Sequence, residues 1–136
     1  MSDSEKWAWW ALGVVALTIA AYGAFLALLG HKPAIPAVFA LLALTAVPAF
    51  SRRRRRDLRF DEREREIAGK AGMAGFGAFW VAFVGVIVGM GYVHGWSGTL
   101  TLPVWTLSEI VCWAWILVLS VQSVTTIVLY RGGSHE

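Results

Sequence analysis

Four long stretches of the sequence are almost free of charge, and their length limits what the chain can fold into. They cover residues 7–30, 34–50, 71–93 and 102–130, and the last one carries a single charged side chain, Glu109. A helix needs roughly 20 apolar residues to cross the hydrocarbon core of a bilayer. The runs are continuous and do not alternate with polar residues, so they are not strands of a membrane barrel. The sequence therefore predicts an all-α membrane protein, a bundle of four transmembrane helices forming a single domain over residues 1–136.

The second stretch is the shortest, and the composition supports the same class. Its 17 residues would form an α-helix of about 25 Å, slightly less than the bilayer core. Hydrophobic residues make up 57% of the chain and charged residues 15%, whereas soluble domains carry about 25% charged residues. Such a chain cannot cover the surface of a soluble enzyme with polar groups, and its one cysteine excludes a disulfide-stapled module. The first stretch is longer than the 7–15-residue apolar region of a signal peptide, so we expect a retained helix.

The basic residues predict the orientation of the bundle. Four helices place eleven of the twelve Lys and Arg residues on one side of the membrane and only Lys32 on the other. Cytoplasmic loops carry the excess of positive charge in membrane proteins. We therefore expect both termini and residues 51–70 to lie in the cytoplasm, with the protein in the cytoplasmic (inner) membrane.

Residues 51–70 form a charged arm that holds fourteen of the 21 charged residues. Its first half contains five consecutive arginines, which are Arg52, Arg53, Arg54, Arg55 and Arg56. Arginines at this position anchor the chain to anionic lipid headgroups, at about 1 kcal/mol each, or they form a docking surface for a protein. Arginines held at a membrane surface read nucleic acid poorly, so we expect no nucleic-acid partner.

The second half of the arm alternates acidic and basic residues before the third stretch. Helical spacing pairs Asp61 with Arg65 and Glu66 with Lys70, which predicts a charged helix that leads into the membrane. This helix is either a solvated, self-neutralised face or a docking surface for a cytosolic partner that includes Asp61, Glu62 and Arg63.

The same segment resembles a known group of proteins. Uncharacterised small prokaryotic membrane proteins (DUF-type) with four helices carry the signature D-E-R-x-x-x-I-x-x-K-A between helices 2 and 3. In this chain the matching residues are Asp61, Glu62, Arg63, Ile67, Lys70 and Ala71. The resemblance implies a prokaryotic membrane protein and hints at a role beside a partner, but it implies no activity.

Small residues in the third stretch follow a heptad spacing and predict where helices pack. They are Ala71, Gly75, Ala78, Ala82, Gly85 and Gly89, which share one face of the helix. Small residues let helix backbones approach closely in lipid. This small-residue seam predicts either packing inside the bundle, against a face of Ala16, Ala20, Gly23, Ala24 and Ala27 in the first stretch, or a homo-oligomer.

Three polar side chains of the fourth stretch are candidates for intramembrane chemistry. Glu109 is costly in a bilayer unless it is protonated or paired, so it is a proton- or cation-coupling acid, a partner contact, or a hydrogen-bonded tie to a neighbouring helix. Cys112 lies one turn away, and Gln122 lies on the opposite face.

The remaining polar residues form no pattern that is typical of catalysis. His31 and His94 lie at the outer ends of helices, but their spacing is not specific for a metal, and no histidine at mid-depth is available for haem. We therefore expect no enzyme activity, metal or cofactor. The sequence favours a small accessory or regulatory membrane subunit that binds a partner or itself, and the alternative is a small oligomeric proton- or cation-coupled transporter or channel that uses Glu109.

Overall fold

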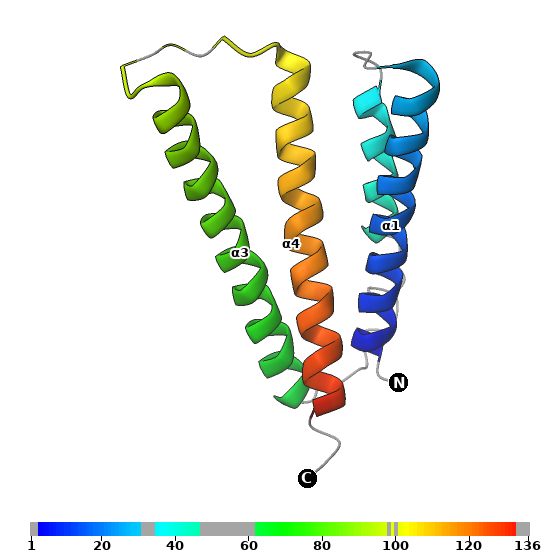
Figure 1. Cartoon of the computed structure of the whole chain (residues 1–136). Coiled ribbons are helices and arrows are strands. Elements are labelled where there is room, and N and C mark those ends of the chain that lie inside the picture. Colours follow the sequence, from blue (N-terminus) through cyan, green and yellow to red (C-terminus); the bar gives the residue numbers. More distant parts are fainter. Residues whose placement is uncertain (1–2, 31–34, 47–61, 98, 100, 133–136) are drawn as a thin grey trace.

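The chain folds into four helices in the computed structural model, which describes residues 3–30, 35–46, 62–97, 99 and 101–132. The helices are α1 (Asp3–Leu29), η1 (Ile35–Ala46), α3 (Glu62–His94) and α4 (Val104–Gly132) (Figure 1). Glycines follow two of the helix ends, because Gly30 and Gly95 adopt φ angles of 69° and 76°, which other residues rarely tolerate. The all-α class is confirmed.

Three of these helices are long and apolar enough to cross a membrane, namely α1, α3 and α4. Their bounds include almost all of three of the predicted stretches. The second predicted span, residues 34–50, corresponds to η1, and its residues 34 and 47–50 lie outside the described chain.

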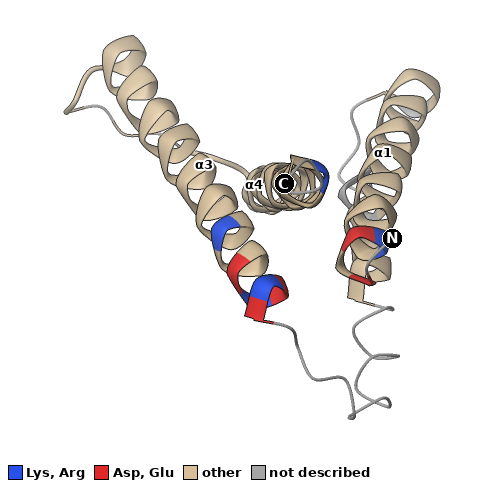
Figure 2. Cartoon of the chain, turned by 90° about the horizontal axis from the view of Figure 1, so that it is seen from below, with Lys and Arg blue, Asp and Glu red and all other residues tan. Residues whose placement is uncertain are grey.

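α4 occupies the middle of the molecule. α3 packs against one side of it, while α1 and η1 pack together on the other side (Figures 1 and 2). The buried core between α1, η1 and α4 consists of Val15, Phe39, Leu42, Ile116 and Leu119. α4 therefore contacts all three other helices, while η1 packs mainly against α1.

α1 uses a different face from the one that the sequence predicted. Its buried residues are Ala8, Ala11, Val14, Val15 and Thr18, whereas the predicted alanine and glycine face at positions 16, 20, 23, 24 and 27 is exposed. The prediction of that face was wrong because it assumed packing against α3. The actual neighbours of α1 are α4 and η1.

η1 is a 3₁₀-helix of twelve residues and not an α-helix. A 3₁₀-helix has three residues per turn, so residues three apart lie on one face. Phe39, Leu42 and Thr45 are all buried, while Ala40 and Ala43 are exposed. The rise of about 2.0 Å per residue stretches the twelve residues to about 24 Å. Ala40, Ala43 and Ala46 are also spaced three residues apart and lie together on the exposed side.

The buried residues of α3 all lie in its first half. Ala71 and Gly75 are buried there, and residues 80–90 are all exposed. The small-residue seam is therefore divided. Its members Ala71 and Gly75 pack inside the molecule, while Ala82, Gly85 and Gly89 face outward.

The charged residues gather at one end of the molecule. α1 begins, α3 begins and α4 ends at this charged end (Figures 1 and 2). Of the Asp, Glu, Lys and Arg residues in the described ranges, Glu109 is the one that lies away from it, near the start of α4.

Candidate functional site

Glu109 lies in the second turn of α4 and is 9% exposed. Its Oε1 atom accepts a hydrogen bond from the hydroxyl of Tyr22 on α1, at 3.1 Å. The contact joins residues 87 positions apart in the sequence. It satisfies a carboxyl group that would otherwise be costly among apolar side chains, and it links α1 to α4.

Three aromatic rings lie next to this hydrogen bond, each from a different helix. The Tyr22 ring centroid lies 5.3 Å from that of Phe39 on η1 and 5.4 Å from that of Trp113 on α4. Phe39 and Trp113 meet edge to face at 5.7 Å. These separations are typical of favourable aromatic pairs, so the cluster fixes the surroundings of Glu109.

Tyr22 was not among the residues predicted from the sequence. A signal for it was present, because Tyr22 lies about two turns from the end of the first stretch and Glu109 about two turns from the start of the fourth. Since these two stretch ends are on the same side in a four-helix arrangement, the two polar groups share a depth. Matching polar residues by depth would have found the pair.

Cys112 and Gln122 are not brought to Glu109 as one site. Cys112 is a partly buried free thiol, and it lines a cavity of about 750 Å³ between η1, α3 and α4. Gln122 lies against α3, where its Cβ atom is 3.4 Å from the position of a Cβ built on Gly75. It lines a second cavity, of about 590 Å³, toward the charged end. The three candidates therefore serve different parts of the molecule.

Hydrogen bonds join the helices at the charged end. The indole nitrogens of Trp7 and Trp10 donate to the carbonyl oxygens of Thr45 at 3.3 Å and Leu44 at 3.1 Å. These are among the last carbonyls of η1, which have no partner within the helix. α1 therefore caps η1 and fixes its end.

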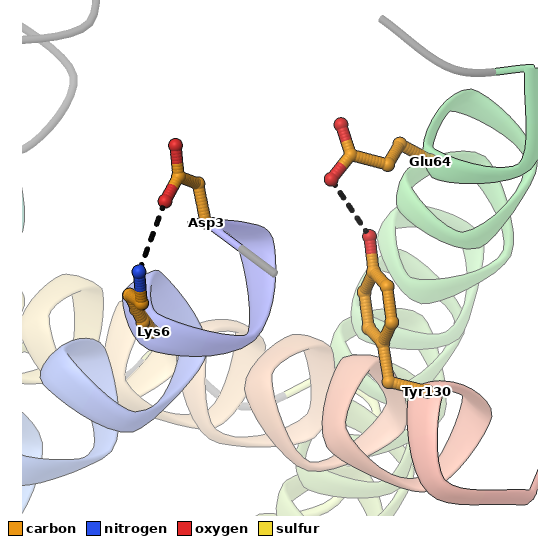
Figure 3. A network of polar contacts seen from close by, with 4 residues as sticks. All are labelled: Asp3, Lys6, Glu64 and Tyr130. Atoms are coloured by element: carbon orange, nitrogen blue, oxygen red, sulfur yellow. Dashed lines mark hydrogen bonds and ion pairs between the residues drawn. The ribbon is translucent and has the colours of Figure 1, made fainter. Parts of the chain in front are cut away.

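α3 and α4 also meet at the charged end. The Tyr130 hydroxyl donates to Oε1 of Glu64 at 3.4 Å, near the ion pair of Lys6 and Asp3 at the start of α1 (Figure 3). The guanidinium group of Arg131 lies 5.7 Å from the ring centroid of Trp9, within the range of a cation–π contact. The end of α4 thus contacts both neighbouring helices.

The predicted docking residues lie partly in the described chain. Glu62 and Arg63 are exposed in the first turn of α3. The predicted pair of Glu66 and Lys70 is confirmed, with a separation of 2.6 Å. Arg52, Arg53, Arg54, Arg55, Arg56 and Asp61 lie outside the described residues, and so does His31. His94 ends α3 far from the charged end.

Within the described ranges, no three His, Cys, Asp or Glu side chains come together in a group that could hold a metal ion. The arrangement instead offers apolar and amphipathic surfaces, a buried hydrogen-bonded acid and a charged end. These features can bind lipid or helices.

The comparisons with known proteins place the chain in a family. The family model described as "Predicted membrane protein (DUF2178)" matches residues 4–131, which covers α1, η1, α3 and nearly all of α4. Searches of curated proteins and of solved structures found no match. The resemblance to uncharacterised membrane proteins is confirmed at this level, while the D-E-R-x-x-x-I-x-x-K-A signature stays a prediction.

Proposed function

The chain belongs to the DUF2178 family of predicted membrane proteins, and we propose that it is a small accessory subunit that binds a neighbouring membrane protein. In this proposal η1 and the residues after it form a fourth span. Both termini and residues 51–70 lie in the cytoplasm, because eleven of the twelve basic residues fall on that side. The membrane is the cytoplasmic membrane of a prokaryote.

The exposed outer half of α3 carries the proposal. Residues 80–90 are all exposed among the described parts of the chain. Gly85 and Gly89 lie four residues apart in this half, and a Cβ built on either meets nothing within 4 Å. Small residues at this spacing permit the close backbone approach that drives association of helices in lipid. The surface suits a helix of another protein.

The charged arm supports the same role from the cytoplasmic side. Arg52, Arg53, Arg54, Arg55 and Arg56 hold the arm at anionic headgroups in this proposal. Exposed Glu62 and Arg63 then present both signs of charge to a cytosolic part of the partner. Charge complementarity of this kind selects partners more than it adds affinity. The proposal includes no catalytic role.

Site-specific photo-crosslinking in cells tests the proposal. A photoreactive amino acid at Val86 lies on the exposed half of α3, and one at Leu28, also exposed, lies on α1 as the matched control. We expect a protein adduct of one discrete mass from position 86 and none from position 28. The adduct should weaken in Gly85→Leu and when Asp61, Glu62 and Arg63 are replaced by Ala.

Two results would overturn this reading. Crosslinks to lipid alone at position 86 would mean that this half of α3 faces only the bilayer. An adduct of twice the chain's own mass would identify a homo-oligomer instead of a separate partner.

The buried acid supports a second candidate, a proton- or cation-coupled transporter. Glu109 is enclosed by helices and hydrogen-bonded to Tyr22, and acids inside membrane helices often take part in ion pathways. This role can be tested by reconstituting the purified chain in liposomes. The measured quantity is the proton flux into the liposomes that a potassium diffusion potential drives. Transport predicts that Glu109→Gln abolishes the flux, whereas equal flux in the variant and the wild type excludes it.

A further inference from the structure

The two cavities lie along the same side of α4 and share a wall. The larger is lined by residues of η1, α3 and α4, and the smaller by residues of all four helices; the side chain of Trp115 lines both. They form one groove that runs along α4 from the charged end, with η1 on one flank and α3 on the other. We refer to it as the α4 groove.

The two parts of the α4 groove differ in chemistry. The part away from the charged end has an almost entirely apolar lining, which includes Phe39, Leu42, Phe76 and Phe79. The part at the charged end has a mixed lining, in which apolar side chains such as Trp7, Ile67 and Leu119 lie beside the polar side chains of Ser4, Thr45, Glu64, Gln122 and Thr126. The groove is therefore amphipathic along its length.

We propose that the α4 groove binds a membrane lipid whose headgroup carries a primary ammonium group, as ethanolamine lipids do. The acyl chain lies in the apolar part, against Trp115 and Phe76. The headgroup lies at the charged end, beside Glu64 and Gln122. This role is independent of partner binding by the exposed half of α3.

The charge at the head end selects the ammonium group. Glu64 is the one charged side chain among the described residues that line this part, and it provides a carboxylate with no lining cation beside it. The amide oxygen of Gln122 is a second acceptor. Hydrogen bonds between an ammonium group and a carboxylate are among the stronger ones in proteins. Among the described residues, this lining offers an anionic headgroup no cationic side chain to pair with.

The size and position of the groove select a lipid. Ligand sites commonly measure about 300–1,000 Å³, and the parts measure about 750 and 590 Å³. The polar part adjoins the helix ends that carry the charged residues, and the apolar part adjoins the long apolar helices. A lipid in a bilayer has the same order, with its head at the surface and its chains inside.

Lipid retention measured by native mass spectrometry tests the proposal. The full chain is released from nanodiscs made of equal parts phosphatidylethanolamine and phosphatidylglycerol. We expect one retained lipid, with a ratio of ethanolamine lipid to phosphatidylglycerol about ten times the bulk ratio, as a charge-assisted hydrogen bond allows. Glu64→Gln should return the retained lipid to the bulk ratio, while Glu62→Gln, on the same helix but not in the lining, should not.

A second pair of variants tests the acyl-chain part. Gly72 lines the groove and Gly85 does not, yet a Cβ built on either meets nothing within 4 Å. Gly72→Leu should therefore fill the groove and reduce retention of both lipids at least fivefold, while Gly85→Leu should retain as much lipid as the wild type. Circular dichroism of both variants separates loss of the groove from loss of folding.

Several outcomes would overturn the proposal. Retention at the bulk ratio in the wild type would show surface lipid only, and undiminished retention in a folded Gly72→Leu variant would place the lipid elsewhere. Loss of lipid in both glycine variants would show that retention depends on the fold and not on the groove. A dimer that retains no lipid would show that a second copy covers this face.

Discussion

The contact between α3 and α4 at Gly75 predicts the cost of adding a side chain there. A Cβ built on Gly75 lies 3.0 Å from the carbonyl oxygen of Val118, and 3.4 Å from the Cγ1 atom of Val118 and the Cβ atom of Gln122. The nearest atom belongs to the backbone of α4, so it cannot rotate away. A larger side chain must push the two helices apart, and overpacking of this kind costs about 1–3 kcal/mol.

We therefore expect Gly75→Leu to lower the free energy of unfolding by about 2 kcal/mol, near the middle of that range. Gly85→Leu is the matched control on the same helix, because a Cβ there meets nothing within 4 Å, and we expect its free energy of unfolding to change by less than about 0.5 kcal/mol. Equilibrium unfolding in mixed micelles of a mild detergent and dodecyl sulfate, followed by circular dichroism, measures both. Equal stability of the two variants would refute the close approach of α3 to α4.

Three further predictions use the same unfolding measurement. A double-mutant cycle of Tyr22→Phe and Glu109→Gln should give a coupling energy of about 0.6 kcal/mol, the average for hydrogen bonds between membrane helices, and a value of zero would contradict the bond between α1 and α4. Leu42→Ala should destabilise the chain by about 2 kcal/mol, because Leu42 is 7% exposed, whereas Leu44→Ala, at 39% exposed, should have little effect; similar losses would place η1 wrongly. Ser123→Ala should leave the stability unchanged or raise it, because the Ser123 hydroxyl is buried without a hydrogen-bond partner in the described chain, and a loss above about 1 kcal/mol would reveal a partner for it.

The sequence predicted the long helices well because their signal is compositional. An apolar run bounded by charges determines where a membrane helix begins and ends. It also predicted that charged residues lead into the third stretch as a helix, and α3 does begin at Glu62. The confirmed pair of Glu66 and Lys70 follows from helical spacing alone. Such features depend on residues close together in the chain.

The winding of η1 and the face of α1 depended on tertiary packing. Alanines occur on more than one face of the first stretch, so composition alone does not tell which face is buried. The choice follows from the neighbours, since Ala8 and Ala11 pack inside the molecule while Ala16 is exposed. In η1, Phe39, Leu42 and Thr45 share one buried face because the helix has three residues per turn.

The candidate site was predicted in part. Glu109 stood out because a carboxyl group inside an apolar stretch needs a partner. Its partner Tyr22 was missed because a tyrosine does not stand out in an apolar run. The Tyr22 hydroxyl becomes a partner for Glu109 only when α1 lies beside α4. The groove lined by Trp115 was also invisible in the sequence, because it arises from the angle between α3 and α4.

The uneven packing of α3 separates what holds the chain together from what it presents to its surroundings. The described contacts of α3 with α4 include the close approach at Gly75 and the hydrogen bond from Tyr130 to Glu64, both in the first half of α3. In the outer half, residues 80–90 are all exposed within the described chain. In lipid, apolar side chains alone give helices no reason to associate, whereas small residues do, through close backbone packing. Gly85→Leu should therefore leave the free energy of unfolding of the isolated chain unchanged and still disrupt a complex. A variant of this kind measures the effect on binding separately from the effect on stability.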